Sequence, residues 1–166
     1  GHMIEAAVAY YEATGKKKFL DIVSRFADLI CDTFGAEEGK IHGYPGHQEI
    51  ELALVKLYRV TGTHKYLELA KYFIDARGEG ENYFLNEEKK PAFKRIFPDF
   101  HDYNPAYSQS HQPVRKQKTA EGHAVRANYM YSAMADLACE YEDDRLKAAC
   151  ENLWDNMVHK RMYITG

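Results

Sequence analysis

Two histidines that each follow a glycine stand just before long helical patterns in this chain of 166 residues. His47 precedes the segment QEIELALVKLYRVTG, and His123 precedes AVRANYMYSAMADLA. The first turn of a helix has unpaired N–H groups and a partial positive charge, so a polar side chain placed there can reach a ligand while the helix keeps its packing. We therefore expect His47 and His123 to line a shared pocket. Helix capping or a buried structural role is the alternative for each.

Acidic residues beside both histidines raise the question of metal or acid–base chemistry. His47 and Glu51 are four residues apart and can share a helix face, but such a pair supplies two ligands where a zinc site needs three or four. Glu121 is either a general acid or a partner of the helix dipole. We expect no metal site in this chain, and its residues leave the roles of Glu121 and Arg126 open.

The composition indicates a soluble globular domain and excludes two classes of partner. With 22 basic and 25 acidic side chains the net charge is −3, which argues against a nucleic-acid partner. No apolar run approaches the ~20 residues of a membrane span, and no signal peptide is recognisable, so we expect no membrane partner. Residues 1–3 (Gly-His-Met) are typical of a cloning remnant, which leaves residues 4–166 as one domain.

The three cysteines, Cys31, Cys139 and Cys150, contain no CxxC pair. An odd number without motif spacing favours free thiols in a reducing compartment, so we expect a cytoplasmic location. Each lies in a helical pattern, which predicts a small buried apolar side chain.

The chain repeats a unit of two helices joined by a tight turn. Thr14-Gly15 and Thr61-Gly62 occupy the same place in two such units, and a left-handed glycine there ends the first helix. Gly35 and Gly78 are predicted to end the second helices in the same way. A third unit follows, with its turn at Asp143-Asp144. No segment alternates with period two, so we expect an all-α protein.

Apolar residues at helical spacing predict the buried faces of these helices. The first two helices have Ile4, Ala7, Val8 and Tyr11, then Phe19, Ile22, Val23 and Phe26. The third has Ile50, Ala53, Leu54 and Leu57, with Leu52 and Val55 on a second side, which predicts a helix buried between layers. The last hairpin has Ala127, Met130, Met134 and Leu137, then Leu146, Ala149 and Leu153.

A long segment at about residues 78–118 separates the second and third hairpins. It contains four prolines and many aromatic residues, so we expect an ordered loop folded over the pocket end. Tandem hairpins indicate an α/α toroid whose first helices are the inner ones, which would place His47 and His123 on one rim. A closed toroid of six hairpins needs roughly twice this length, at ~10–14 residues per helix plus loops. The chain is therefore interpreted as a fragment of a catalytic domain.

Several longer strings are similar to those of one enzyme family. GYPGHQEIELALVKLYRVTGTHKYLELAKYFIDARG, QSHQPV (Gln109–Val114), AEGHAVRA (Ala120–Ala127) and the terminal RMYITG resemble glycoside hydrolase family 127, which contains β-L-arabinofuranosidases. The resemblance covers nearly all of the chain after residue 3. It implies the N-terminal part of an (α/α)6 barrel, which β-sandwich domains follow in the family.

The resemblance also implies a chemistry and a set of site residues. Family members hydrolyse terminal β-L-arabinofuranosides with retention, using a cysteine nucleophile on a zinc ion held by further Cys and Glu ligands, and a glutamate acid/base. All of these lie downstream of the YITG motif, so zinc is expected in the full-length parent and no cofactor in this chain. His47 and His123 match histidines that bind furanose hydroxyls, and His111 matches a further motif and is a third candidate for substrate binding. A further pocket histidine of the family would lie upstream of residue 1. We expect this chain alone to be inactive.

Two other classes of function stay open on the residues alone. One is a helical-repeat carbohydrate-binding module, and the other is a different α/α toroid enzyme, such as a uronyl hydrolase or a sugar epimerase. In any of them a cut toroid exposes apolar helix surface, so we expect a homo-oligomer or a domain-swapped dimer.

Overall fold

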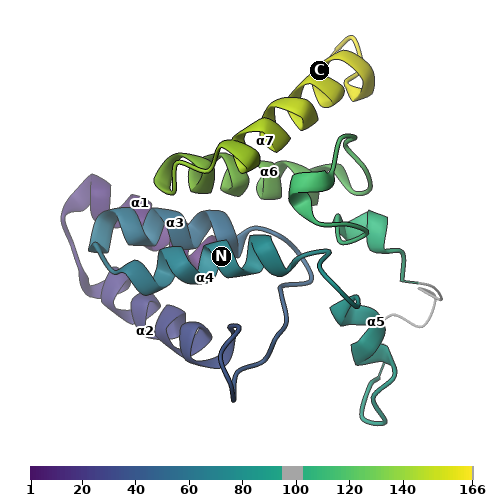
Figure 1. Ribbon diagram of the computed structural model, residues 1–166. Helices are drawn as coiled ribbons and strands as arrows, with labels where there is room; N and C mark the ends of the chain where they lie inside the picture. The colour runs from purple at the N-terminus through teal and green to yellow at the C-terminus, as the bar shows by residue number, and fades with distance from the viewer. Residues whose placement is uncertain (95–102, 166) are drawn as a thin grey trace.

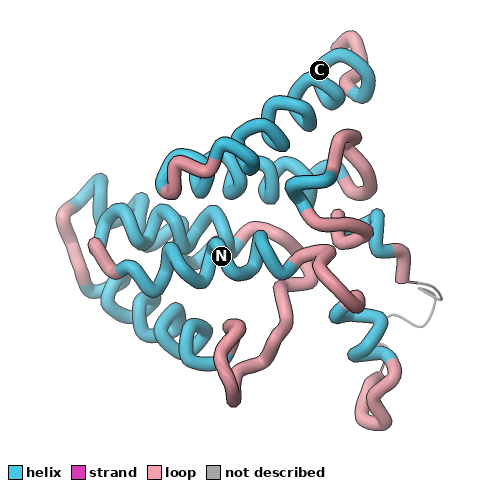
Figure 2. The backbone as a smooth tube through the Cα atoms, viewed as in Figure 1, coloured by secondary structure: helices cyan, strands magenta, loops and turns pink. Residues whose placement is uncertain are grey.

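The computed structural model describes residues 1–94 and 103–165, and this part of the chain is built from helices and loops (Figure 1, Figure 2). Three helix hairpins follow one another: α1 (His2–Thr14) with α2 (Lys18–Thr33), α3 (Ile50–Thr61) with α4 (His64–Ala76), and α6 (Ala124–Glu140) with α7 (Asp144–Asn156). The shorter helices are α5 (Tyr83–Glu88), η1 (Pro105–Ser108), η2 (Val114–Lys116) and the π-helical η3 (Met157–Arg161). Within the described residues, strand-type pairing is limited to an isolated bridge between Phe34 and Ile41. The all-α prediction is confirmed.

Left-handed glycines end the first helices of the first two hairpins, as predicted. Gly15 and Gly62 have φ values of 68° and 69°, and their N–H groups donate to the carbonyls of Tyr11 and Tyr58. The second helices end differently, because α2 is capped by Phe34 and α4 by Arg77, both with extended backbone. The prediction was therefore wrong for Gly35 as a cap. Gly78 does have a φ of 79°, but it follows the cap, where an added Cβ would lie 2.2 Å from the Gln112 carbonyl oxygen.

Helix α3 lies at the centre of the fold, as its two apolar sides predict. It packs against α1, α4 and α6. Four of its apolar side chains have no exposed surface: Ala53, Leu54, Val55 and Leu57. Burial of apolar surface is the main favourable contribution to folding, at about 25 cal/mol for each Å² removed from water.

Helix α2 buries a different face from the one that its periodicity predicts. The residues turned to the core are Leu20, Val23, Ala27 and Cys31. Ile22 and Phe26 instead face outward, with 38% and 63% of their surface exposed, and Leu29 beside them is 62% exposed. The helix is apolar on two sides, and periodicity alone does not tell which side meets the core.

The first helices of the hairpins pack side by side, and so do the second helices of the first two hairpins. Contacts join α1 to α3 and α3 to α6, while α2 contacts α4. This is the arrangement of an α/α toroid, of which the chain forms a part. The loops that precede α3 and α6, and the described parts of the long loop, gather at one end of the helices (Figure 1, Figure 2). Phe97, Pro98, Phe100 and His101 lie outside the described residues.

The cysteines are all free, and their environments differ. Cys31 is buried and Cys150 half-buried, whereas Cys139 is exposed. The prediction of burial was therefore wrong for Cys139, which lies on the outer side of α6. Among the described residues, no helix combines the length and apolar character needed to cross a lipid bilayer.

Candidate functional site

The imidazoles of His47 and His123 face each other although 76 residues separate them in the chain. Their ring centroids are 6.3 Å apart with the ring planes inclined by 68°. Tyr129 lies beside His47, with ring centroids 6.1 Å apart, and Tyr107 lies beside His123 at 5.4 Å. His47 is exposed and His123 half-buried, so this cluster of imidazole and phenol rings is open to solvent. Topology explains the proximity, because adjacent first helices begin at the same end of the fold.

The hydrogen bonds of the two rings assign them opposite tautomers. His47 Nδ1 lies 2.6 Å from the carbonyl oxygen of Gln48, which accepts only, so His47 carries its proton on Nδ1 and presents Nε2 as an acceptor. His123 is the N-cap of α6, where its Nδ1 accepts from the N–H of Arg126. In neutral form His123 therefore presents Nε2–H as a donor. The pair offers one acceptor and one donor to a bound hydroxyl group.

Gly122 allows the loop before α6 to approach η1 closely. Its φ is 75°, and an added Cβ would lie 2.1 Å from the carbonyl oxygen of Ala106. The close approach lets the His123 N–H donate to the Tyr107 carbonyl at 3.0 Å. A glycine is needed here because both the left-handed φ and the crowding exclude a side chain.

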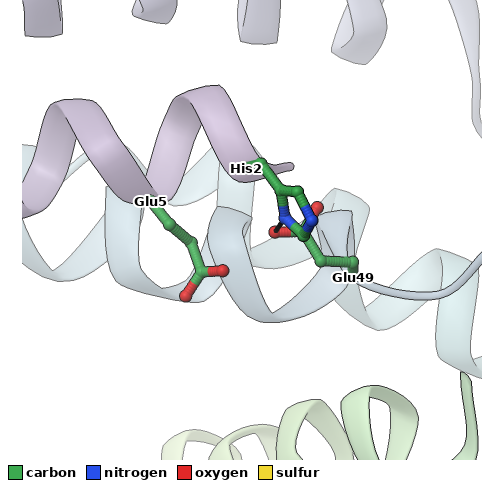
Figure 3. A group of neighbouring side chains, drawn as sticks. All are labelled: His2, Glu5 and Glu49. Carbon is green, nitrogen blue, oxygen red and sulfur yellow. Dashed lines mark ion pairs between the residues drawn. The ribbon is translucent and has the colours of Figure 1, made fainter. Parts of the chain in front are cut away.

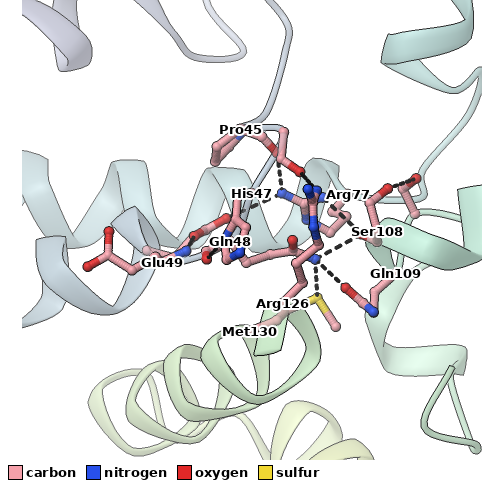
Figure 4. Close-up of polar contacts among 12 residues, drawn as sticks. Pro45, His47, Gln48, Glu49, Arg77, Ser108, Gln109, Arg126 and Met130 are labelled. Carbon is pink, nitrogen blue, oxygen red and sulfur yellow. Dashed lines mark hydrogen bonds and ion pairs between the residues drawn. The ribbon is translucent and has the colours of Figure 1, made fainter. Parts of the chain in front are cut away.

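Arg126 connects the start of α6 to the loop that carries His47. Its Nη1 donates to the carbonyl of Gly46, and its guanidinium lies over the Tyr107 ring, 5.1 Å from the centroid. Arg126 thus fixes the two histidine segments relative to each other, a role that the sequence leaves open (Figure 4).

A buried ion pair is hydrogen-bonded to the loop that carries His47. Arg77 and Glu51 have no exposed surface, and Arg77 Nη2 lies 3.5 Å from Glu51 Oε1. Arg77 also donates to the carbonyls of Pro45 (2.6 Å) and Ser108 (3.1 Å), while Glu51 Oε2 accepts from the N–H of Glu49. Burial lowers the pKa of Arg77, and the charge of Glu51 opposes this effect. Glu51 is therefore a structural residue that shapes the turn before α3.

His2 belongs to the same cluster, and the sequence interpretation missed it. Its ring centroid is 6.1 Å from that of Tyr129, and its Nδ1 lies 2.8 Å from Glu49 Oε1. The signal was present: Gly1-His2 opens α1 as Gly122-His123 opens α6, but residues 1–3 were interpreted as a cloning remnant. Three Gly-His pairs, and not two, lead into first helices.

Figure 3 shows the one group of possible metal ligands found in the described part of the chain: His2, Glu5 and Glu49, whose ligand atoms lie within 4.8 Å of one another. Glu5 is paired with Lys56, and Glu49 Oε1 lies 2.8 Å from His2 Nδ1, so each carboxylate already has a partner. No cysteine belongs to this group. The residues present therefore do not fit the zinc site of Cys and Glu ligands that the family resemblance implies, and no chemistry is derived through zinc.

The side chains of the remaining candidates contact residues other than the two facing histidines. His111 is exposed, and its Nε2 lies 3.2 Å from the side-chain nitrogen of Gln112. The Glu121 carboxylate accepts from Thr119 Oγ1 at 2.9 Å and pairs with Arg161 at 3.4 Å. His42, His64 and His159 are exposed.

Helix hairpins arranged as in an α/α toroid, with histidines gathered at one end of the inner helices, place the chain in the class of α/α-toroid domains. Comparison with known proteins assigns the chain within it. Residues 1–166 match the family described as "Beta-L-arabinofuranosidase, GH127 catalytic domain". The chain belongs to glycoside hydrolase family 127. The match begins at Gly1, so it includes the tripeptide interpreted as a cloning remnant.

Relatives are similar over the whole chain but are much longer. A non-reducing end β-L-arabinofuranosidase of Bifidobacterium longum subsp. longum is 45% identical over 166 residues, which are 100% of this chain and 25% of the relative. The crystal structure of a family 127 β-L-arabinofuranosidase from Geobacillus stearothermophilus T6 is 55% identical, with a TM-score of 0.93, over 99% of this chain and 26% of that one. A second β-arabinofuranosidase structure of the family is 46% identical with a TM-score of 0.83, over 99% of this chain and 23% of that one. The chain thus spans about a quarter of the length of these relatives.

Proposed function

We propose that this chain carries part of the sugar-binding pocket of a retaining β-L-arabinofuranosidase and is inactive by itself. The observation that carries the proposal is the facing pair of His47 and His123, 6.3 Å apart and open to solvent. A furanose has hydroxyl groups on neighbouring carbons, each of which can both donate and accept a hydrogen bond. An acceptor on His47 and a donor on His123 match such a pair of hydroxyls.

His2 and the tyrosines extend this pocket. We include His2 as a third imidazole because it shares Tyr129 with His47. Tyr107 and Tyr129 supply flat apolar surface for the carbon skeleton of the sugar. We do not assign His111 a contact with the same sugar unit, and it stays a candidate for substrate groups farther out.

The reaction itself needs groups that this cluster does not contain. Retaining glycosidases use a nucleophile and an acid/base about 5–5.5 Å apart. Imidazoles that bind hydroxyls orient the sugar and contribute to affinity, but neither forms the glycosyl intermediate. The role of this chain is recognition of the terminal arabinofuranosyl group, with hydrolysis left to the full-length parent.

The proposal is tested by binding and turnover measured on the same protein. Methyl β-L-arabinofuranoside should bind in a titration followed by nuclear magnetic resonance, with a Kd near 1 mM, which corresponds to about −4 kcal/mol. An aryl β-L-arabinofuranoside should not be hydrolysed. Methyl α-D-glucopyranoside is the control sugar, and stronger binding of it would favour a different sugar specificity.

Histidine variants identify the binding residues. His47→Ala and His123→Ala should each weaken binding about tenfold, since the loss of a hydrogen bond to a bound ligand costs about 1–1.5 kcal/mol. His42→Ala is the matched control, because His42 is exposed and lies outside the cluster. Turnover by the isolated chain, or unchanged binding in both His47 and His123 variants, would contradict the proposal.

A further inference from the structure

Buried glutamine side chains connect the segments that carry His47 and His123. Gln48 and Gln109 have no exposed surface, and Gln117 is 1% exposed. An amide removed from water without hydrogen-bond partners costs roughly 1–3 kcal/mol. A buried glutamine side chain is therefore expected to form hydrogen bonds within the protein. Gln48 Nε2 donates to Gln109 Oε1 at 2.7 Å and to the Ser108 carbonyl at 2.8 Å (Figure 4).

Gln109 joins this contact to the segment of His123. Its Nε2 donates to the carbonyl oxygens of Glu121 (2.8 Å) and His123 (3.2 Å). Its oxygen accepts from Gln48, which is the residue directly after His47. One side chain thus bonds to both histidine segments, while none of its hydrogen bonds goes to an imidazole ring.

The backbone of Gln109 is held in a conformation that a non-glycine residue rarely adopts. Its φ is 55°, in the left-handed region, which costs roughly 1–2 kcal/mol for a residue with a side chain. Gln117 Nε2 donates to the Gln109 carbonyl at 2.9 Å and so helps to hold this conformation. Such strain persists where the surrounding structure determines it, and it is concentrated near functional sites.

We propose that Gln109 is a positioning residue for sugar recognition, which sets the separation of the His47 and His123 imidazoles through its amide. This inference rests on the proposed function of the histidine pair. An amide is needed at position 109 because the side chain accepts a hydrogen bond from Gln48 and also donates hydrogen bonds to backbone carbonyls. Leucine does neither, and an ionised glutamate accepts only.

The test separates positioning from general stability by following the imidazoles directly. The ring ¹H–¹³C signals of His47 and His123 are recorded for Gln109→Leu, Gln48→Leu and the control Tyr66→Phe. Gln109→Leu should shift the signals of both rings, and Gln48→Leu should shift the signal of His123, on the far side of Gln109. Tyr66→Phe removes the hydroxyl of a side chain that is 3% exposed, together with its hydrogen bond of 2.6 Å to Asp28, and should lower stability, but the signals of both histidine rings should stay as in the wild type.

Sugar affinity gives the second measurement. Gln109→Leu should weaken the binding of methyl β-L-arabinofuranoside about tenfold, although residue 109 lies behind the rings. If Gln109→Leu does not fold, Gln48→Leu tests the same connection from its other end. An unchanged signal of the distant histidine, together with sugar affinity within about twofold of the wild type, would overturn the inference. Failure of the wild type to bind the sugar would instead refute the proposed function, and the ring signals would then decide the positioning role alone.

Discussion

The carboxylate of Glu51 and the guanidinium of Arg77 form an ion pair in which neither side chain has exposed surface, with Nη2 and Oε1 3.5 Å apart. Removal of one partner leaves an uncompensated buried charge, which costs about 3–5 kcal/mol. Arg77→Met should therefore lower the free energy of unfolding by this amount. Chemical denaturation monitored by circular dichroism measures the change.

Two further variants separate the charge effect from the loss of packing. The double variant Arg77→Met with Glu51→Gln should recover part of the loss, because no charge is left buried. Arg59→Met, which removes ion pairs with Asp136 and Glu140 from a side chain that is 42% exposed, should cost less than about 1 kcal/mol. If Arg77→Met costs no more than Arg59→Met, the buried pair does not support the loop as we describe.

Local patterns predicted the hairpins, because a helix and its cap depend on neighbouring residues. Gly15 and Gly62 end α1 and α3 as predicted. Ile22 and Phe26 on α2 were predicted to lie in the core, but they are exposed. The helix has two apolar faces, and the spacing of apolar residues does not indicate which face is buried.

The site could be predicted only where topology determines it. The facing pair of His47 and His123 follows from first helices that begin at one end. The contact between Gln48 and Gln109 spans 61 residues of chain, and nothing in the pattern of either segment indicates it. His2 was overlooked although its Gly-His pair was visible, because residues 1–3 were interpreted as a cloning remnant. Its contacts with Glu49 and Tyr129 are seen only in the folded chain.

Gly122 should tolerate substitution less well than another glycine of the same conformation. Gly122→Ala forces a Cβ to within 2.1 Å of the Ala106 carbonyl, whereas the space around Gly15 is open at a φ of 68°. Gly15→Ala should cost about 1 kcal/mol from the backbone alone. Gly122→Ala should cost more and should weaken sugar binding. Equal losses for the two variants, by thermal unfolding and sugar titration, would contradict the close approach of this loop to η1.

Alkaline pH should destabilise the protein through Cys31. Burial raises the pKa of its thiol to about 11, from an ordinary value of 9.0. The unfolded chain therefore loses this proton at lower pH than the folded protein does. The stability that the protonated Cys31 thiol contributes is complete below about pH 9 and is lost as the pH rises to 11. Since one pKa unit corresponds to about 1.4 kcal/mol, the loss is about 2 kcal/mol by pH 11.

Denaturation at several pH values measures this loss, and Cys31→Ala is the matched variant. The slope of stability against pH between 9 and 11 should be smaller in Cys31→Ala than in the wild type. The same slope in both proteins would assign the alkaline effect to other groups. Cys139, which is exposed, should react with a thiol reagent before Cys31 at neutral pH.

Self-association should involve the exposed apolar surfaces on the two outer sides of the hairpin array. One is the strip of Ile22, Phe26 and Leu29 on α2. The other is a groove of about 570 Å³ between α6 and α7, lined by Tyr131, Cys150 and Trp154 among others. Exposed apolar patches of this kind promote association, so the strip of one copy should pack into the groove of another.

Trp154 reports on this association because it is the single tryptophan of the chain and is 64% exposed. Its fluorescence should shift to shorter wavelength as protein concentration rises, in parallel with an increase in mass by light scattering. Phe26→Lys should abolish both changes by placing a charge in the strip. Leu85→Lys is the control, since Leu85 is an exposed apolar residue of α5, away from both surfaces. A wild type that stays monomeric at high concentration, with an unchanged tryptophan spectrum, would exclude association through these faces.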